Sequence, residues 1–259
     1  MDIKSLFNEN EIPLENIPLN GGFCGILRKI GCIGDSMSSG EFEAINEKGE
    51  KTYHDMFDYS WGQFLARICG TTVLNFSRGG MTAKEYCESF AQENDFWNPE
   101  KKCVAYIIAL GVNDLLNCDM PTGTTDDIDL ENHENNKPTF AGYYAKIIQK
   151  YKEIQPDAKF FLMTFPKENI GKDKRNAHAE LLYKLAELFS NCYILDIGKY
   201  GPAYDEEFRK KFFMGGHMNP CGYALTAQMV ASYIDYIIRH NMDDFMEVGF
   251  IGTNLKFKD

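Results

Sequence analysis

The 259-residue chain has no apolar run long enough to cross a membrane. Its richest apolar stretch, Val104 to Val112, has only about half of the roughly 18 residues that a transmembrane helix needs, and it contains a glycine. The first eleven residues show no basic segment followed by an apolar one and no small-residue cleavage site. We therefore expect neither a secretory signal in this stretch nor a membrane partner.

Positive charge is scarce as well. The chain carries 27 Lys and Arg against 38 Asp and Glu, which gives a formal net charge of −11. Nucleic acids and anionic membranes select basic faces, so we expect neither as a partner. The contents of 44% hydrophobic and 25% charged residues are ordinary for a folded globular protein and exclude a disordered one.

The eight cysteines include no C-x-x-C pair, which excludes a zinc ribbon and the common redox motif. Several lie among apolar neighbours, as Cys103 and Cys192 do, where a free cysteine behaves as a small buried hydrophobe. Together with the absent signal, this predicts reduced thiols in a cytoplasmic protein. We also find no cluster of Asp and His with metal-ligand character, so no metal or cofactor is expected.

Five short runs rich in Val, Ile, Phe and Tyr alternate with segments of helical period. Such runs are typical of buried parallel strands, and their alternation with helices predicts a parallel sheet covered on both faces. The length fits one domain over residues 1–259, with peripheral extensions at 1–24 and 243–259. The predicted strands are residues 26–33, 72–76, 103–110, 158–165 and 192–197.

An acidic insertion at residues 117–138 interrupts this pattern after the third predicted strand. Two interpretations stay open for it: a solvated loop, or a lid that selects the substrate, since long loops are often functional.

Polar residues follow several of the predicted strands, where ligands bind in an open parallel sheet. Ser36 comes after the first strand in a Gly-Asp-Ser turn, and His217 precedes the last helix. A serine hydroxyl is a weak nucleophile unless a base takes its proton, and His217 is the only histidine directly after a late strand. Ser36 as a helix cap and His217 as a structural loop residue are the alternatives.

The same sheet edge offers hydrogen-bond donors for a developing oxyanion. They are the N–H of Ser36, the N–H of Gly80 and the side-chain amide of Asn113, with Gly79 as the competitor of Gly80. Gly80 and Asn113 could also be turn formers. A nucleophile, a base and an oxyanion hole together indicate acyl transfer. We expect Asp35 and Asp114 to hold loops, and the remaining histidines, His54, His133, His178 and His240, to lie on the surface.

Taken in order, these blocks resemble the SGNH/GDSL hydrolase family. The resemblance covers residues 31–223 and implies a flavodoxin-like three-layer α/β/α sandwich that hydrolyses carboxylic esters without metal or cofactor. It implies Ser36 and His217 as catalytic residues and an oxyanion hole of Ser36, Gly80 and Asn113. The matching segments are Gly34-Asp35-Ser36-Met37, Asn75 to Thr82, Gly111-Val112-Asn113-Asp114, and His217 with Asn219-Pro220.

One position departs from the family pattern. Members usually carry an Asp three residues before the histidine, where its carboxylate orients the imidazole, and here that residue is Met214. A backbone carbonyl that accepts the second ring N–H is our first hypothesis. The alternative is a carboxylate nearby in sequence, from Asp205, Glu206 or Glu207.

The polar surroundings of Ser36 favour a short acyl group, such as acetyl, on a polar or carbohydrate alcohol. We therefore expect a small-molecule ester, including acylated sugars, as the substrate. The alternatives are a non-catalytic carbohydrate-binding protein that keeps the fold, and a lipase or thioesterase for longer acyl chains, because fold does not choose among them.

Overall fold

The computed structural model of the chain describes residues 7–257, and its centre is a five-stranded, all-parallel sheet. Each of the five predicted strands is present in the structure. Most of their ends lie one to three residues inside the predicted range, and β1 and β4 end one residue beyond it. The order across the sheet is β4-β1-β5-β6-β7. The strands are β1 (Lys29–Gly34), β4 (Thr72–Ser77), β5 (Ala105–Ala109), β6 (Lys159–Met163) and β7 (Cys192–Leu195).

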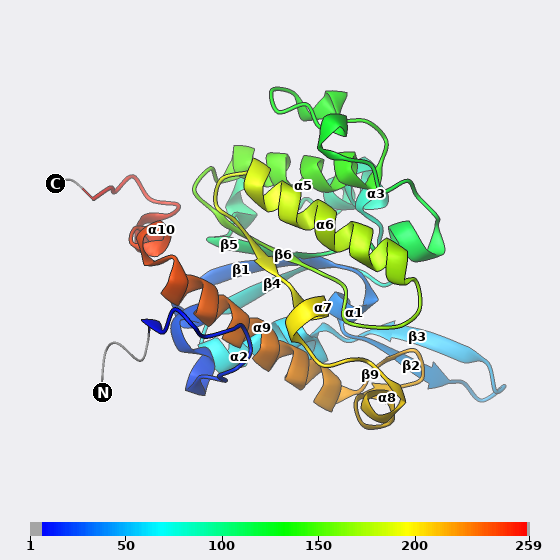
Figure 1. Ribbon diagram of the computed structural model, residues 1–259. Helices are drawn as coiled ribbons and strands as arrows, with labels where there is room; N and C mark the ends of the chain where they lie inside the picture. Colours follow the sequence, from blue (N-terminus) through cyan, green and yellow to red (C-terminus); the bar gives the residue numbers. More distant parts are fainter. Residues whose placement is uncertain (1–6, 258–259) are drawn as a thin grey trace.

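Helices cover both faces of this sheet, which gives the predicted three-layer α/β/α sandwich (Figure 1). Helices α2 (Trp61–Cys69) and α9 (Pro220–His240) pack on one face, and α5 (Phe140–Ile154) and α6 (Lys172–Leu188) pack on the other. Neighbouring strand residues serve opposite faces: Ile107 belongs to the α2–α9 side, whereas Tyr106 and Ile108 belong to the α5–α6 side. This is the period of two that a strand buried on both faces requires.

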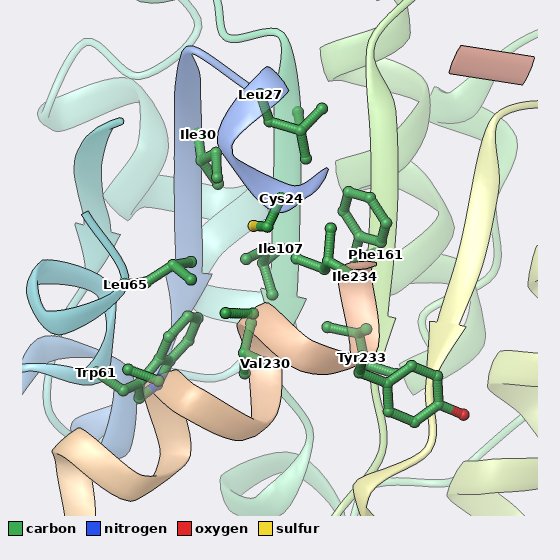
Figure 2. Packing of buried hydrophobic residues seen from close by; sticks show 14 of the residues in the cluster. Cys24, Leu27, Ile30, Trp61, Leu65, Ile107, Phe161, Val230, Tyr233 and Ile234 are labelled. Carbon is green, nitrogen blue, oxygen red and sulfur yellow. The ribbon is translucent and has the colours of Figure 1, made fainter. Parts of the chain in front are cut away.

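Two separate apolar cores result from this arrangement. Figure 2 shows the core under α9, where side chains from α2 and α9 converge on those of the sheet. Its labelled members are almost fully buried and include Trp61, Leu65, Ile107, Phe161, Val230 and Ile234. Burial of such apolar surface, at about 25 cal/mol per Å², fixes the strands and therefore the positions of the loops at their carboxyl ends.

The strand order places a crevice beside β1. From β1 the chain moves to β4 on one side and then crosses to β5 on the other. Loops that leave neighbouring strands in opposite directions open a crevice between them, and ligands bind there in folds of this kind. The loops after β1 and β5 carry Ser36 and Asn113.

Two small antiparallel hairpins were not predicted from the sequence. Strands β2 (Glu41–Ile45) and β3 (Lys51–Asp55) form a hairpin directly after the first block. Strands β8 (Phe213–Met214) and β9 (His217–Met218) form the second, around Gly215-Gly216. In Figure 1 the β2–β3 hairpin extends from the sheet at the end where β9 lies, and β2 contacts β9.

Short helices and turns complete the fold. The helices are α1 (Ser36–Ser39), α3 (Ala83–Glu85), α4 (Ala91–Glu93), α7 (Ile197–Tyr200), α8 (Glu206–Phe212) and α10 (Met242–Phe245). The 3-10 and π turns are η2 (Leu19–Ile26), η3 (Phe57–Tyr59), η4 (Tyr86–Phe90), η5 (Pro99–Lys101), η6 (Val112–Asn117), η7 (Thr125–Asp127), η8 (His133–Asn135) and η9 (Val248–Phe250). None of the helices within residues 7–257 is both long and apolar enough to cross a membrane.

The terminal extensions and the acidic insertion, which lie outside the alternation of strands and helices, differ in how they pack. Turn η2 contacts α2 and α9, and Cys24 within it is fully buried in the core, so this end of the predicted peripheral extension is part of the packed body. Residues 1–6 and 258–259 of the predicted extensions lie outside the described residues. The acidic insertion is held by hydrogen bonds close to it in the chain, because Asp127 accepts from Lys137 and from the adjacent Thr139. It is also held by α5, whose Lys146 donates to Glu134.

Candidate active site

Ser36 begins the short helix α1 immediately after β1. The preceding residue, Asp35, caps this helix, because its carboxylate accepts a hydrogen bond from the Met37 N–H at 3.1 Å. The Ser36 N–H donates to no acceptor among the described residues. The cap therefore belongs to Asp35, and Ser36 is half-buried with its backbone donor unengaged.

The structure distinguishes Gly80 from Gly79 as the backbone donor of the second block. The Gly79 N–H donates to Asp55 Oδ2 at 3.2 Å, whereas the Gly80 N–H has no acceptor within the described part of the chain. Gly80 also adopts a φ of +72°, a conformation that side-chain-bearing residues rarely take. Of the two, Gly80 has the free donor.

The amide of Asn113 is oriented by two hydrogen bonds. Its nitrogen donates to the Met81 carbonyl at 3.0 Å, and its oxygen accepts from Asn117 at 2.8 Å. A primary amide carries two N–H bonds, so one donor is left over. Because the oxygen is held by Asn117, the amide cannot rotate without losing both bonds.

Two buried aspartates hold the loops that carry these donors. Asp114, which is fully buried, accepts from the Ala83 N–H and so ties the loop after β5 to the loop after β4. Burial raises the pKa of Asp114 to about 6 and that of Asp35 to about 7. Both aspartates bind backbone N–H groups, in keeping with the expected structural role.

His217 lies on β9 between two carboxylates of strand β2. Glu41 Oε1 is 3.0 Å from Nε2 without forming a hydrogen bond to it, and Glu43 Oε1 is 3.9 Å from Nδ1. The ring of Tyr53 meets the imidazole edge-on at 5.9 Å. Burial lowers the pKa of His217, and the negative charges of Glu43 and Asp55 oppose that shift.

The structure supports neither expectation about the partner of His217. No backbone carbonyl among residues 7–257 accepts from its ring, and Nδ1 is buried without a hydrogen-bond partner there. Asp205 instead caps α8 through the Phe208 N–H, while the exposed Glu206 and Glu207 pair with lysines one helical turn away. The carboxylates at the ring come from β2, far from His217 in the sequence.

All four predicted site residues line one cavity of about 440 Å³: Ser36, Gly80, Asn113 and His217. Its lining also has a polar part, in which Arg175 and Arg209 both donate to Glu168. A smaller, mostly apolar cavity of about 80 Å³ adjoins it and shares Met37 among its lining residues. Ser36 and His217 face the same space without a direct hydrogen bond.

The sequence model of the GDSL-like lipase/acylhydrolase family matches residues 32–225, which contain all four blocks. The chain belongs to this family. A search of curated protein sequences finds no significant match.

Solved structures of a lipase/acylhydrolase and of two carbohydrate esterases share the fold. The lipase/acylhydrolase from Enterococcus faecalis matches with a TM-score of 0.52 and 16% identity over 82% of this chain and 97% of that one. A family 3 carbohydrate esterase from Clostridium thermocellum matches with a TM-score of 0.53 and 15% identity over 82% and 97%. A family 2 carbohydrate esterase from Corynascus thermopiles matches with a TM-score of 0.53 and 17% identity over 88% and 69%.

Two sequence expectations within this GDSL-like chain need correction or extension. His178, expected on the surface, is fully buried: its ring stacks on Phe165 at 3.7 Å, and burial lowers its pKa to about 3. The β2–β3 hairpin, which brings Glu41 and Glu43 to the site, was missed. The available signal was the alternation Glu-Phe-Glu, which places both carboxylates on one face of a strand.

Asn117 is the one member of the acidic insertion among the residues that line the cavity, so the insertion lies mainly over α5 and α6 rather than over the site. Among the described residues no group of three or more His, Cys, Asp or Glu could hold a metal ion.

Proposed function

We propose that this GDSL-family member is a serine esterase in which Ser36 is the nucleophile and His217 the general base. The observation that carries the proposal is the convergence of Ser36, Gly80, Asn113 and His217 on one cavity from four separate segments of the chain. Three N–H donors at this cavity, on Ser36, Gly80 and Asn113, have no acceptor among residues 7–257, as an oxyanion hole requires.

The reaction proceeds in two steps, acylation of Ser36 and hydrolysis of the acyl-enzyme. His217 Nε2 takes the Ser36 hydroxyl proton while the serine oxygen bonds to the acyl carbon, and the resulting oxyanion is held by the three donors. The carbon–oxygen bond to the alcohol then breaks, and His217 returns the proton to the leaving oxygen. Water repeats the sequence, which releases the acid and restores Ser36. Catalytic hydrogen bonds are often long without substrate, so the open Ser36–His217 geometry is compatible with these roles.

We infer a short acyl group from the smaller cavity. Its volume of about 80 Å³ corresponds to roughly five to eight water-sized atoms, and it adjoins the nucleophile loop at Asp35 and Met37. Apolar side chains form most of it, as an acyl chain requires: Trp61, Met163, Phe165, Ile197 and Met218.

A polar alcohol, including a sugar, fits the larger cavity. Tyr53, Glu168 and Arg209 line it and offer donors and acceptors for hydroxyl groups. The carbohydrate esterases among the structures of similar fold are consistent with this substrate class. The net charge of −11 supports a small-molecule partner over nucleic acid or anionic lipid. The cytoplasmic location stays a prediction from the sequence.

The test compares wild type with Ser36→Ala on p-nitrophenyl esters of increasing acyl length, followed by acetylated sugars. We expect the acetyl ester to be hydrolysed fastest and Ser36→Ala to lose about 10⁴-fold or more in kcat. Ser89→Ala, in the turn η4, is the matched control and should retain activity. Hydrolysis that survives in Ser36→Ala would contradict the assignment. Oligosaccharide binding without Ser36-dependent hydrolysis would favour the non-catalytic alternative.

A further inference from the structure

We propose that Glu43, on strand β2, is the carboxylate that positions His217 by holding the ring in the tautomer protonated at Nδ1. The proposal rests on the proposed function and deepens it, because it supplies the partner that position 214 lacks. Met214 pairs directly with His217 across the β8–β9 hairpin, but it carries no acceptor and its side chain is 46% exposed.

The two ring nitrogens of His217 have different surroundings. Nδ1 is buried and makes no hydrogen bond within residues 7–257, yet Glu43 Oε1 is 3.9 Å away. A base that takes the Ser36 proton at Nε2 must carry its own proton at Nδ1. An acceptor is therefore needed on the Nδ1 side, and Glu43 is the carboxylate found there.

Glu43 is itself held in place. Its Oε1 accepts a hydrogen bond from the Gly216 N–H at 2.9 Å, and Lys51 pairs with its Oε2 at 3.3 Å. The hydrogen bond from Gly216 lowers the pKa of Glu43, so the carboxylate is ionised when the reaction runs. A fixed anion beside the ring orients it and stabilises the imidazolium that forms when His217 takes the serine proton.

The turn before His217 is shaped around this carboxylate. A Cβ on Gly215 would come within 1.9 Å of Glu43 Oε2, and a Cβ on Gly216 within 2.8 Å of Oε1. Gly215 also has a φ of +72°, which closes the tight turn between β8 and β9. The two glycines thus let the histidine loop lie directly against Glu43.

Glu41 lies on the Nε2 side of the ring, so it cannot hold the ring in the tautomer that is protonated at Nδ1. It lies 3.0 Å from Nε2, so a proton drawn towards Glu41 would sit on the nitrogen that has to accept one from Ser36. Burial, with the charges of Asp55 and Glu43 nearby, raises the pKa of Glu41. Glu43 therefore favours the reactive tautomer, and Glu41 favours the opposite one.

The kinetic test is Glu43→Gln, which keeps the size of the side chain and an acceptor for Gly216. We expect kcat to fall about 10²-fold with KM within about threefold, because the base is misoriented while the cavity is unchanged. The exposed Glu47→Gln, on the same hairpin, is the matched control and should behave as wild type. A larger fall for Glu41→Gln than for Glu43→Gln would assign the positioning role to Glu41 and overturn the proposal.

A second measurement needs no substrate, so it tests the Glu43–His217 pairing independently of the esterase assignment. NMR titration of the His217 ring in wild type and Glu43→Gln reports its pKa directly. The charged groups around the ring are Glu41, Glu43, Asp55 and Lys51. Removal of the Glu43 charge should lower the His217 pKa, whereas an unchanged pKa would overturn the proposal. If Ser36→Ala keeps full activity but the His217 pKa shifts as expected, the esterase assignment fails and the Glu43–His217 pairing stands.

Discussion

His217 is subject to opposing influences that set the pH at which it works. Burial disfavours the charged imidazolium and lowers its pKa, while Glu43 and Asp55 favour the charged form and limit the shift. The net effect is a pKa below the ordinary value of 6.5. A general base is active when it is unprotonated, so the neutral form must predominate at physiological pH.

This direction gives a testable pH dependence. As pH rises through the lowered pKa of His217, the base loses its proton, so kcat/KM should increase to a plateau that begins near neutrality. The midpoint of the rising limb should lie below pH 6.5. A pH series of kcat/KM with an acetyl ester measures it. A midpoint above 7, or activity that falls between pH 6 and 8, would contradict the role of His217.

The site residues differ in how far the sequence could predict them. Ser36, Gly80 and Asn113 each follow a strand within a short local motif, and parallel strands bring their carboxyl ends to one edge. The Glu43 contact to the histidine loop joins residues 173 positions apart. No local periodicity encodes such a contact, so the partner of His217 could not be identified before the structure.

At the scale of elements, the β2–β3 hairpin joins the separate loops of the site. Its last residue, Asp55, accepts hydrogen bonds from Ser39 Oγ on α1 and from the Gly79 N–H. Its first strand contacts the His217 loop through Glu43 and Gly216. One hairpin thus contacts the loops that carry the nucleophile, the Gly80 donor and the base.

Asp55→Ala should weaken catalysis through this connection. Without the carboxylate the Gly79 N–H loses its acceptor, so the neighbouring Gly80 donor is held less firmly where the oxyanion develops. We expect a fall in kcat of about tenfold with little change in KM, because the donor acts mainly in the transition state. Steady-state kinetics on Asp55→Ala and on the exposed Asp58→Ala provide the measurement and its control. Equal kinetics in the two variants would show that the hairpin does not support the oxyanion loop.

The hairpin escaped prediction for a physical reason. Only Phe42 of β2 packs on the core, where its ring meets those of Tyr59 and Tyr223. The other face carries the carboxylates of the site, so the alternation Glu41-Phe42-Glu43 contains a single apolar residue, and a pattern this short does not indicate a half-buried strand. The sequence also predicted where the acidic insertion begins and ends. Its position over α5 and α6 results from contacts with these helices, which the composition of the segment does not encode.

At the scale of the whole molecule, the parallel sheet and its cover of helices on both faces could be predicted because their signal is repeated along the chain, whereas the order of the strands comes from the structure. Five apolar runs and the helices between them define a parallel sheet. The exact burial of single polar groups could not be predicted. His178 lies on a helix with a modest apolar face, and its complete burial results from the packing of Phe140 and Phe165 around it.

The burial of Asp35 makes the stability of the folded protein depend on pH. Burial raises its pKa from 3.8 to about 7, so the folded chain holds this proton more tightly than the unfolded chain does. The stability from this group is complete below pH 3.8 and is lost as pH rises through about 7. Asp35→Asn removes the charge and keeps an oxygen to accept from the Met37 N–H.

Thermal unfolding across pH tests this link. The Tm of Asp35→Asn relative to wild type should increase from about pH 4 to pH 7 and then level off, with each kcal/mol worth roughly 2–4 °C. The exposed Asp126→Asn is the control and should follow wild type at every pH. A difference in Tm that does not depend on pH would mean that folding does not raise the pKa of Asp35.

Covalent labelling tests whether Ser36 is the group that attacks the substrate. A fluorophosphonate ester captures an activated serine as a stable adduct, which peptide mass spectrometry locates. We predict a single adduct on Ser36, none in Ser36→Ala, and slow labelling in His217→Ala because the base is gone. An adduct on another residue, or no adduct in protein that still hydrolyses the acetyl ester, would contradict it.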